Sequence, residues 1–303
     1  MRRLAFFLML TVGIFAGCQK EVMGPDETNL EAIRQMITED PLFTSDGATL
    51  NDDGPVIFKT GDVATPIYPR GWGRRITQVS RTIDFDSVSD TLVVATVKHT
   101  ITGEIRIAAR YSLQDTTITI VTKPFVEETL RKVKLYRVAR TNNTRLNWRP
   151  REVSAAKGGT QNALITINKL EARIGTDTVV ITDPTAYWFK LGHFGGREVP
   201  QFSPSQPMTI RVTIRSTASD TDFVSLHRPA LMMAGNFRPA HARMTLVSQV
   251  QIGSAYERVY EYSWNSHLRG RHHVFVSALT RESLFDDQAP FSTQVWGIPY
   301  IVQ

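Results

Sequence analysis

From Arg74 onward, β-branched and aromatic residues alternate with polar residues in runs separated by turn-forming segments, and this texture constrains the fold most strongly. A period of two is typical of strands with one buried face. Only one earlier stretch, residues 30–38, repeats its apolar residues at helical spacing. Asn29 can cap the start of that helix, and Pro41 ends it. The pattern therefore predicts one helix followed by a largely β chain.

The first part of this β-rich region predicts six strands, and residues 45–73 before it predict a loop rich in Gly, Pro and Asp. Thr102 and Gly103 suit a tight hairpin turn between the second and third strands. The expected strands are residues 77–84, 91–100, 104–112, 116–122, 132–140 and 148–153.

Three stretches of this first part resemble a known family. The helix at residues 30–38, the strand DTLVVATV at residues 90–97 and the late stretch at residues 123–154 resemble an NTF2-like domain. The resemblance implies a cone-shaped α+β fold over residues 29–154, with one main helix on a curved antiparallel sheet. Such a cone can hold a small-ligand or catalytic pocket. A lipocalin-like or other barrel is the alternative.

Residues 155–161, AAKGGTQ, are small and suit a flexible linker. After them the chain reads as short strands with turns between them, which favours a sandwich. The stretch ERVYEYSWNSHLRGRHHVFVSALTRES resembles the later strands of bacterial immunoglobulin-like domains, which implies a β-sandwich domain over residues 162–303. The expected strands are residues 164–170, 178–181, 187–191, 209–216, 222–226, 244–251, 258–264, 272–279 and 293–303.

The N-terminus predicts export. Two arginines precede an almost wholly apolar run over residues 4–15, and the small residues Ala16 and Gly17 follow. A charged start, a short apolar core and small residues before a cleavage point are typical of a signal peptide. A spanning helix needs about 20 apolar residues, so this run is too short to cross a bilayer. We therefore expect residues 1–17 to be removed.

Cys18, the only cysteine in the 303 residues, follows directly. Phe15, Ala16, Gly17 and Cys18 resemble the lipobox of bacterial lipoproteins, although leucine is usual where Phe15 stands. The resemblance implies that Cys18 is acylated, by palmitate among other chains, and becomes the first mature residue. Residues 18–28 would then be a tether, and Gln19 implies the outer membrane by analogy with enterobacterial sorting. The alternative is an ordinary signal peptide with a chance cysteine.

Charge is unevenly distributed along the chain. With 35 basic and 29 acidic residues, two of the basic ones in the signal peptide, the mature chain carries 33 − 29 = +4. Residues 129–151 hold eight Lys or Arg and no acid. Cations beside aromatics suit phosphates, sugars or an acidic protein surface. The candidate ligand-binding residues are Lys132, Lys134, Tyr136, Arg137, Arg140, Arg145, Trp148, Arg149 and Arg151. The alternative is a solvated strand face neutralised by the acidic N-terminal segment.

No pattern in the sequence predicts a metal, a cofactor or a catalytic group. His272 and His273 are neighbours on an expected strand and would point to opposite faces, so they would not share a metal. Asp84, Asp86 and Asp90 lack the glycine and the bidentate glutamate of a calcium loop. The chain contains no HExxH, CxxC or GxSxG motif.

Aromatic residues gather near the C-terminus and predict either a filled core or a sugar-binding platform. They are Tyr256, Tyr260, Tyr262, Trp264, Trp296 and Tyr300.

Together these patterns predict an exported, lipid-anchored protein of the bacterial cell envelope with a non-enzymatic binding or assembly role. The expected partners are the membrane, through Cys18, and an anionic glycan, lipopolysaccharide or another envelope protein. An exported chain is not expected to bind nucleic acid. The alternatives are a small-ligand or enzymatic pocket in an NTF2-like cone, and a carbohydrate-binding sandwich.

Overall fold

The computed structural model describes residues 27–44, 53–55, 66–175, 177–192, 198–231, 237–265 and 269–303. The predicted signal peptide and Cys18 lie outside these residues. Within the described part, no helix is both long enough and apolar enough to cross a membrane.

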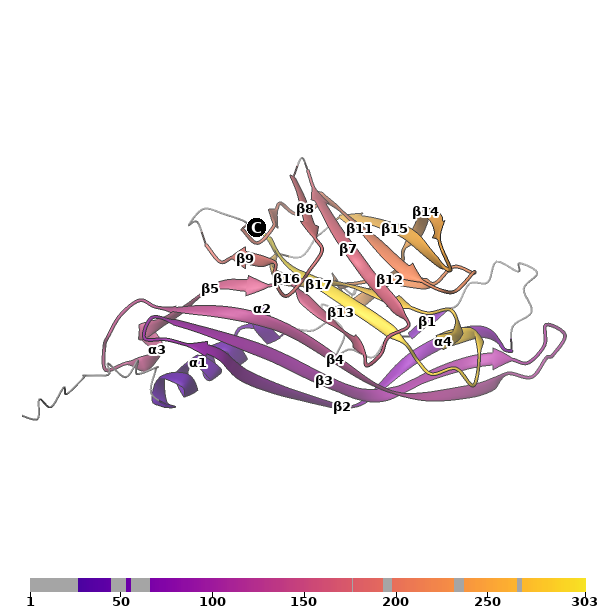
Figure 1. Cartoon of the computed structure of the whole chain (residues 1–303), viewed down its shortest axis with the longest axis horizontal. Coiled ribbons are helices and arrows are strands. Elements are labelled where there is room, and N and C mark those ends of the chain that lie inside the picture. Colours follow the sequence, from indigo (N-terminus) through magenta and orange to yellow (C-terminus); the bar gives the residue numbers. More distant parts are fainter. Residues whose placement is uncertain are drawn as a thin grey trace, which may run out of the picture.

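Three long antiparallel strands form the base of the molecule, and we call them the ribbon (Figure 1). They are β2 (Tyr68–Val88), β3 (Leu92–Arg110) and β4 (Thr119–Arg137), and the short strand β1 (Asp53–Pro55) pairs with the first of them. At about 3.3 Å per residue, strands of this length reach about 60 Å. Buried and partly exposed side chains alternate along β3, so the ribbon has an inner face against the rest of the protein and an outer face.

The predicted hairpin at Thr102 and Gly103 is wrong, because both residues lie inside β3. A Cβ atom on Gly103 would lie 2.5 Å from the carbonyl oxygen of Arg75 and 2.9 Å from the ring of Phe125. The glycine is needed there for close packing and not for a turn. The predicted loop is also wrong over its last residues, since β2 begins at Tyr68.

The predicted helix is present as α1 (Glu27–Glu39), and the described residues also form three four-residue helices: α2 (Pro41–Thr44), α3 (Thr144–Asn147) and α4 (Glu282–Phe285). Ile33 and Ile37 are fully buried in one cluster with Val93 and Val97 of β3. Asn29 is not the cap, because the helix begins two residues earlier. Its side chain instead accepts a hydrogen bond of 2.9 Å from the indole of Trp148.

The prediction of a cone-shaped NTF2-like α+β domain is wrong. A helix of 13 residues is about 20 Å long, so α1 covers only one end of a ribbon about three times its length. The rest of the inner face is covered by strands and α4 from the second half of the chain. The structure is mostly β, with curved antiparallel sheets and no main helix across a sheet.

All nine strands predicted for the second half overlap strands of the structure. Five form one sheet in the order β14-β15-β11-β7-β8. A second layer, in the order β6-β17-β16-β12-β13, continues the sheet of the ribbon beyond β4, and both layers contribute to one core. The predicted separate immunoglobulin-like sandwich is therefore wrong as well, because one layer belongs to the ribbon's own sheet. The bounds are β5 (Trp148–Ser154), β6 (Ala156–Thr160), β7 (Ile165–Ile174), β8 (Asp177–Ile181), β9 (Trp188–Lys190), β10 (Gln201–Phe202), β11 (Pro207–Ser216), β12 (Phe223–Leu231), β13 (Phe237–Arg243), β14 (Thr245–Ile252), β15 (Ala255–Asn265), β16 (Gly270–Leu279) and β17 (Thr293–Val302).

The predicted flexible linker is strand β6, which pairs with β4 on one side and with β17 on the other. A Cβ atom on Gly158 would lie 2.4 Å from the carbonyl oxygen of Glu128. Gly159 has φ +138°, and its Cβ would lie 2.3 Å from the carbonyl oxygen of Thr293. The glycines that suggest flexibility in the sequence let two strands approach a third closely.

We predict that Gly159→Ala destabilises the whole protein. The unfavourable backbone conformation costs about 1–3 kcal/mol, and the overlap with Thr293 adds to it. Gly253→Ala is the matched control, because Gly253 also has positive φ (+65°) but, its chain neighbours aside, no atom of the described residues lies within 4 Å of its Cβ position. Urea unfolding followed by tryptophan fluorescence should show a clearly larger loss for Gly159→Ala. Equal losses would contradict the bridging role of β6.

Candidate functional site

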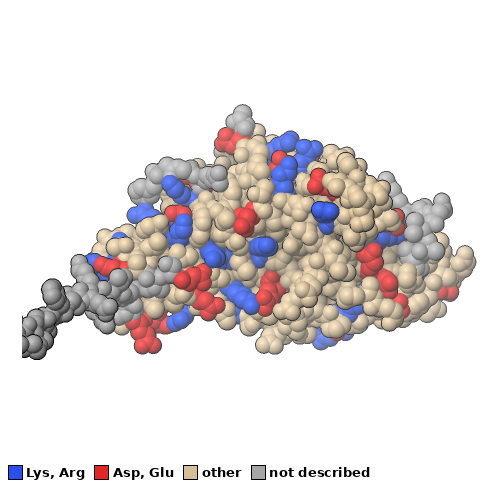
Figure 2. Space-filling view, viewed as in Figure 1, with Lys and Arg blue, Asp and Glu red and all other residues tan. Residues whose placement is uncertain are grey.

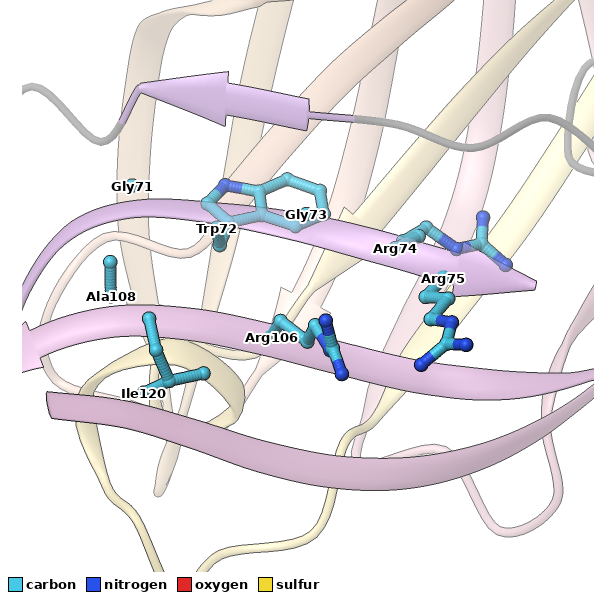
Figure 3. Close-up of a pocket in the computed structure, with 8 residues that line it drawn as sticks. All are labelled: Gly71, Trp72, Gly73, Arg74, Arg75, Arg106, Ala108 and Ile120. Carbon is cyan, nitrogen blue, oxygen red and sulfur yellow. The ribbon is translucent and has the colours of Figure 1, made fainter. Parts of the chain in front are cut away.

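The outer face of the ribbon carries a hollow of about 420 Å³ (Figure 3). It lies at the end of the ribbon that pairs with β1, away from α1 (Figure 1). In the strand register Gly73 lies opposite Arg106, Gly71 opposite Ala108, and Ala108 opposite Ile120. Glycines on β2 and alanine on the neighbouring β3 leave a floor without large side chains, and longer side chains, among them Ile120 of β4, stand around it. The residues lining this ribbon-end hollow are Gly71, Trp72, Gly73, Arg74, Arg75, Arg106, Ala108 and Ile120.

Two arginines with accessible side chains stand at the hollow, on neighbouring strands (Figure 3). Nη1 of Arg75 lies 3.4 Å from Oε1 of Glu104, and Nε of Arg106 donates to the same oxygen at 2.9 Å. Two guanidinium groups and one carboxylate leave one positive charge in this group. The pairs are partly exposed and therefore weak, so an anionic group on a partner can compete for the arginines.

Beside the hollow, the β3–β4 hairpin exposes apolar side chains. Tyr111, Leu113, Ile118 and Ile120 are each more than half exposed, and Ile120 reaches 58%. The hydroxyl of Tyr111 donates to Asp287 at 3.3 Å. Scattered apolar residues are normal on a surface, but a group next to a hollow and two arginines has the composition of a binding surface. We call the hollow and this hairpin together the ribbon-end surface.

The sequence did not point to this surface. Residues 45–73 read as a loop, so Gly71 and Gly73 looked like turn residues. Only the pairing register of β2 with β3 shows that these glycines lie beside Ala108. The paired residues are about 35 positions apart in the sequence, so no local sequence pattern predicts this register.

The nine candidate basic and aromatic residues gather at the opposite end of the ribbon, near α1. Lys132, Lys134 and Tyr136 share the outer face of β4, whereas Arg140 lies beyond the end of this strand at Arg137. Nζ of Lys132 lies 3.3 Å from Asp86, whereas Lys134 and Tyr136 both donate to Glu152, at 2.8 and 3.2 Å. Burial and Glu152 both raise the pKa of Tyr136.

The remaining candidates of this cluster are also largely engaged. Arg137 and Arg140 both pair with Asp90, and Arg145 pairs with Glu39 of α1. Trp148 is fully buried, Arg149 is exposed, and Arg151 is half-buried. Figure 2 shows the same mixture of Lys and Arg with Asp and Glu over the face in view. These contacts favour the interpretation as a neutralised strand face, and a ligand-binding role for the cluster stays a prediction.

Histidines and acidic residues do not converge on a metal. Of the residues described, no group of three or more His, Cys, Asp or Glu could hold a metal ion. His273 is buried and its Nε2 lies 2.8 Å from Nη1 of Arg131, whereas His272 is half-buried and lies against the ring of Tyr300. The two histidines thus have separate surroundings, as predicted.

The two tryptophans proposed for a sugar-binding platform are both in the core. Trp264 and Trp296 are 7% and 3% exposed, and Tyr260 and Tyr300 are also buried. The alternative that the aromatic residues fill the core is confirmed for these four, whereas Tyr256 and Tyr262 are partly exposed. The burial of both tryptophans removes the main support for a carbohydrate-binding sandwich.

Three groups of buried charged side chains stabilise the fold, and two of them lie within the ribbon or between the ribbon and the second half. Arg74 of β2 pairs with Glu127 of β4 at 2.5 Å, and burial raises the pKa of that carboxyl while Arg74 opposes the change. Lys123 of β4 donates to the carbonyl oxygens of Glu282 (3.2 Å), Ser283 (2.8 Å) and Asp286 around α4. Burial lowers the pKa of Lys123 to about 8.

The third group is the ion pair of Asp222 and Arg258, whose side chains are fully buried and 2.6 Å apart. Arg258 also donates to Gln249 and to the carbonyl oxygens of Ala218 and Ser219. Burial raises the pKa of Asp222 to about 6, although Arg258 acts in the opposite direction. Because each of the three guanidinium nitrogens of Arg258 donates to a protein acceptor, this pair holds the loop before β12 in place.

Comparison with known proteins adds no assignment, since no protein-family model matches the chain and no curated protein matches its sequence.

We predict that Asp222 shapes the pH dependence of stability. Its folded pKa of about 6 lies above that of an unfolded aspartate, so the folded state holds the proton more tightly. The contribution of this group to the free energy of unfolding is therefore present below about pH 4 and is lost as the pH rises to about 6. Asp222→Asn cannot titrate, so this part of the pH profile should disappear. Parallel profiles for the two proteins between pH 4 and 7 would show that the prediction is wrong.

Proposed function

We propose that the protein is an exported, lipid-anchored component of the bacterial cell envelope that binds another envelope protein through the ribbon-end surface. The proposed role is binding or assembly and not catalysis. The observation that carries the binding part is the exposed combination of apolar side chains, a hollow and two arginines at the end of the ribbon. The anchoring part is supported by the sequence around Cys18.

In this proposal the two ends of the ribbon have different roles. Eight residues lie between Cys18 and Glu27, the first residue of α1, and a chain of this length can span at most about 30 Å. A lipidated Cys18 would therefore keep the α1 end close to the membrane. The ribbon-end surface lies one strand length away, which is about 60 Å. In this arrangement the ribbon presents its binding surface away from the bilayer.

The chemistry of the surface indicates the class of partner. If apolar side chains of a partner cover the exposed apolar side chains around Ile120, the complex is stabilised by about 25 cal/mol for each Å² of apolar surface removed from water. Arg75 and Arg106 can exchange their shared Glu104 for a carboxylate of the partner. A protein segment that combines apolar and acidic residues fits both features.

We predict that charge changes at Glu104 and at the two arginines act in opposite directions on binding. A photo-crosslinking residue in place of Ile120, in the full chain in intact envelopes, should form a discrete protein adduct. Replacing both Arg75 and Arg106 by Gln should reduce its yield several-fold, and Glu104→Gln should increase it, because the arginines are then free for the partner. The same crosslinker at Leu164, which is also exposed but lies before β7, is the control.

Two results would contradict binding at the ribbon-end surface. One is an adduct yield at Ile120 that is no higher than the yield at Leu164, and the other is a yield at Ile120 that none of the three charge changes alters.

A separate experiment tests the anchor. Metabolic labelling with a palmitate analogue should mark the wild-type chain, and Cys18→Ser should abolish the label while leaving the fold unchanged. Labelling of both chains, or of neither, would contradict lipidation at Cys18.

A further inference from the structure

The loop between β4 and β5, residues 138–147, lies at the α1 end of the ribbon and includes α3 (Figure 1). It exposes two apolar side chains, since Leu146 is half exposed and Val138 nearly so. The buried side chain of Asn147 holds the loop together. It accepts from the backbone N–H of Thr141 at 2.7 Å and donates to the carbonyl oxygen of the same residue at 2.8 Å. A preformed loop therefore presents both apolar side chains to the solvent.

The loop and its two flanks are basic. Residues 137–149 contain four arginines and no acid. Asp90 pairs with two of these arginines and Glu39 with a third, so two positive charges remain. The strand face of β4 is neutralised by its own acids, whereas this loop is not. Ion pairs between exposed side chains are weak, so phosphate groups can compete for the arginines. The four are Arg137, Arg140, Arg145 and Arg149.

A direct contact places this loop beside the start of α1. Nε1 of Trp148, the residue that follows the loop, donates at 2.9 Å to the side chain of Asn29 in the first turn of the helix. The helix begins at most about 30 Å from Cys18. A lipidated Cys18 would therefore keep the loop within reach of the bilayer.

We propose that this loop lies on an anionic lipid surface, with Leu146 and Val138 in the interfacial region of the bilayer and the arginines on the lipid phosphates. Exposed apolar side chains beside cations are the composition that binds such a surface. The position of the loop selects the bilayer as its occupant, because a lipidated Cys18 brings the bilayer, and no particular protein, to this end. Glu27 at the start of α1 opposes the positive charge, so the apolar side chains and the arginines are needed together.

The proposal rests on the anchoring part of the proposed function and extends it. A tether fixed at one point leaves the body of the protein free to tilt against the bilayer. A second contact through the loop would set which end faces the lipid, and it would direct the ribbon-end surface away from the membrane.

The test uses the chain from Gln19 to Gln303, which contains every described residue and no cysteine. This chain has no anchor, so it tests the loop alone, whereas palmitate labelling tests the anchor alone. With an environment-sensitive fluorophore on Leu146→Cys, we expect a blue shift on vesicles of equal amounts of phosphatidylglycerol and phosphatidylcholine. Phosphatidylcholine alone should give no shift, and added salt should reduce the shift. Leu113→Cys is the matched control, an exposed leucine at the other end of the ribbon, and should not respond.

A second measurement separates the arginines of the loop from the overall charge of the protein. Replacing both Arg140 and Arg149 by Gln should weaken binding to the anionic vesicles by about tenfold or more in a flotation assay. Replacing both Arg173 and Arg215 by Gln removes the same charge from exposed positions on β7 and β11, and it should leave vesicle binding unchanged. Far-UV circular dichroism should show the same fold for both variants.

Three results would each overturn the proposal. The first is a chain that does not bind the anionic vesicles at all. The second is a blue shift at residue 113 as large as the shift at residue 146, and the third is an equal loss of binding in the two arginine variants.

Discussion

The structure depends on the backbone pairing of β6 with two strands at once. β4 lies on one side and β17 on the other, so the ribbon of the first half and one layer of the second half become a single sheet. This close approach is possible because Gly158 and Gly159 present no Cβ atom to the neighbouring strands. The two halves then share cores: Phe125 of the ribbon packs with Phe291, and Lys123 holds α4.

The proposed function follows from the stiffness of this arrangement. Three hydrogen-bonded strands of about 20 residues, backed along their inner face by a second layer, hold their two ends at a fixed separation. One end carries α1 and the internally neutralised basic cluster, and the other end carries the ribbon-end surface. We propose that the first end lies near the membrane and the second meets the partner.

The sequence predicted local structure well and long-range organisation poorly. The apolar period of residues 30–38 predicted α1, and alternation predicted all nine strands of the second half, because both signals lie within a few residues. Gly103, Gly158 and Gly159 misled the interpretation, since a glycine for a turn and a glycine for close packing look the same without the neighbouring strands. The ribbon-end hollow was missed for the same reason. The basic cluster was visible, but its partners Asp86, Asp90 and Glu152 became apparent only once the strands were paired.

The central claim is that β6 joins both halves into one cooperative unit, and amide hydrogen exchange tests it most directly. The backbone amides of residues 156–160 should exchange as slowly as those of the central parts of β4 and β17, because all three strands would open only in the same unfolding event. Fast exchange of residues 156–160 between two protected halves would show that this segment is a linker after all, and would contradict the account.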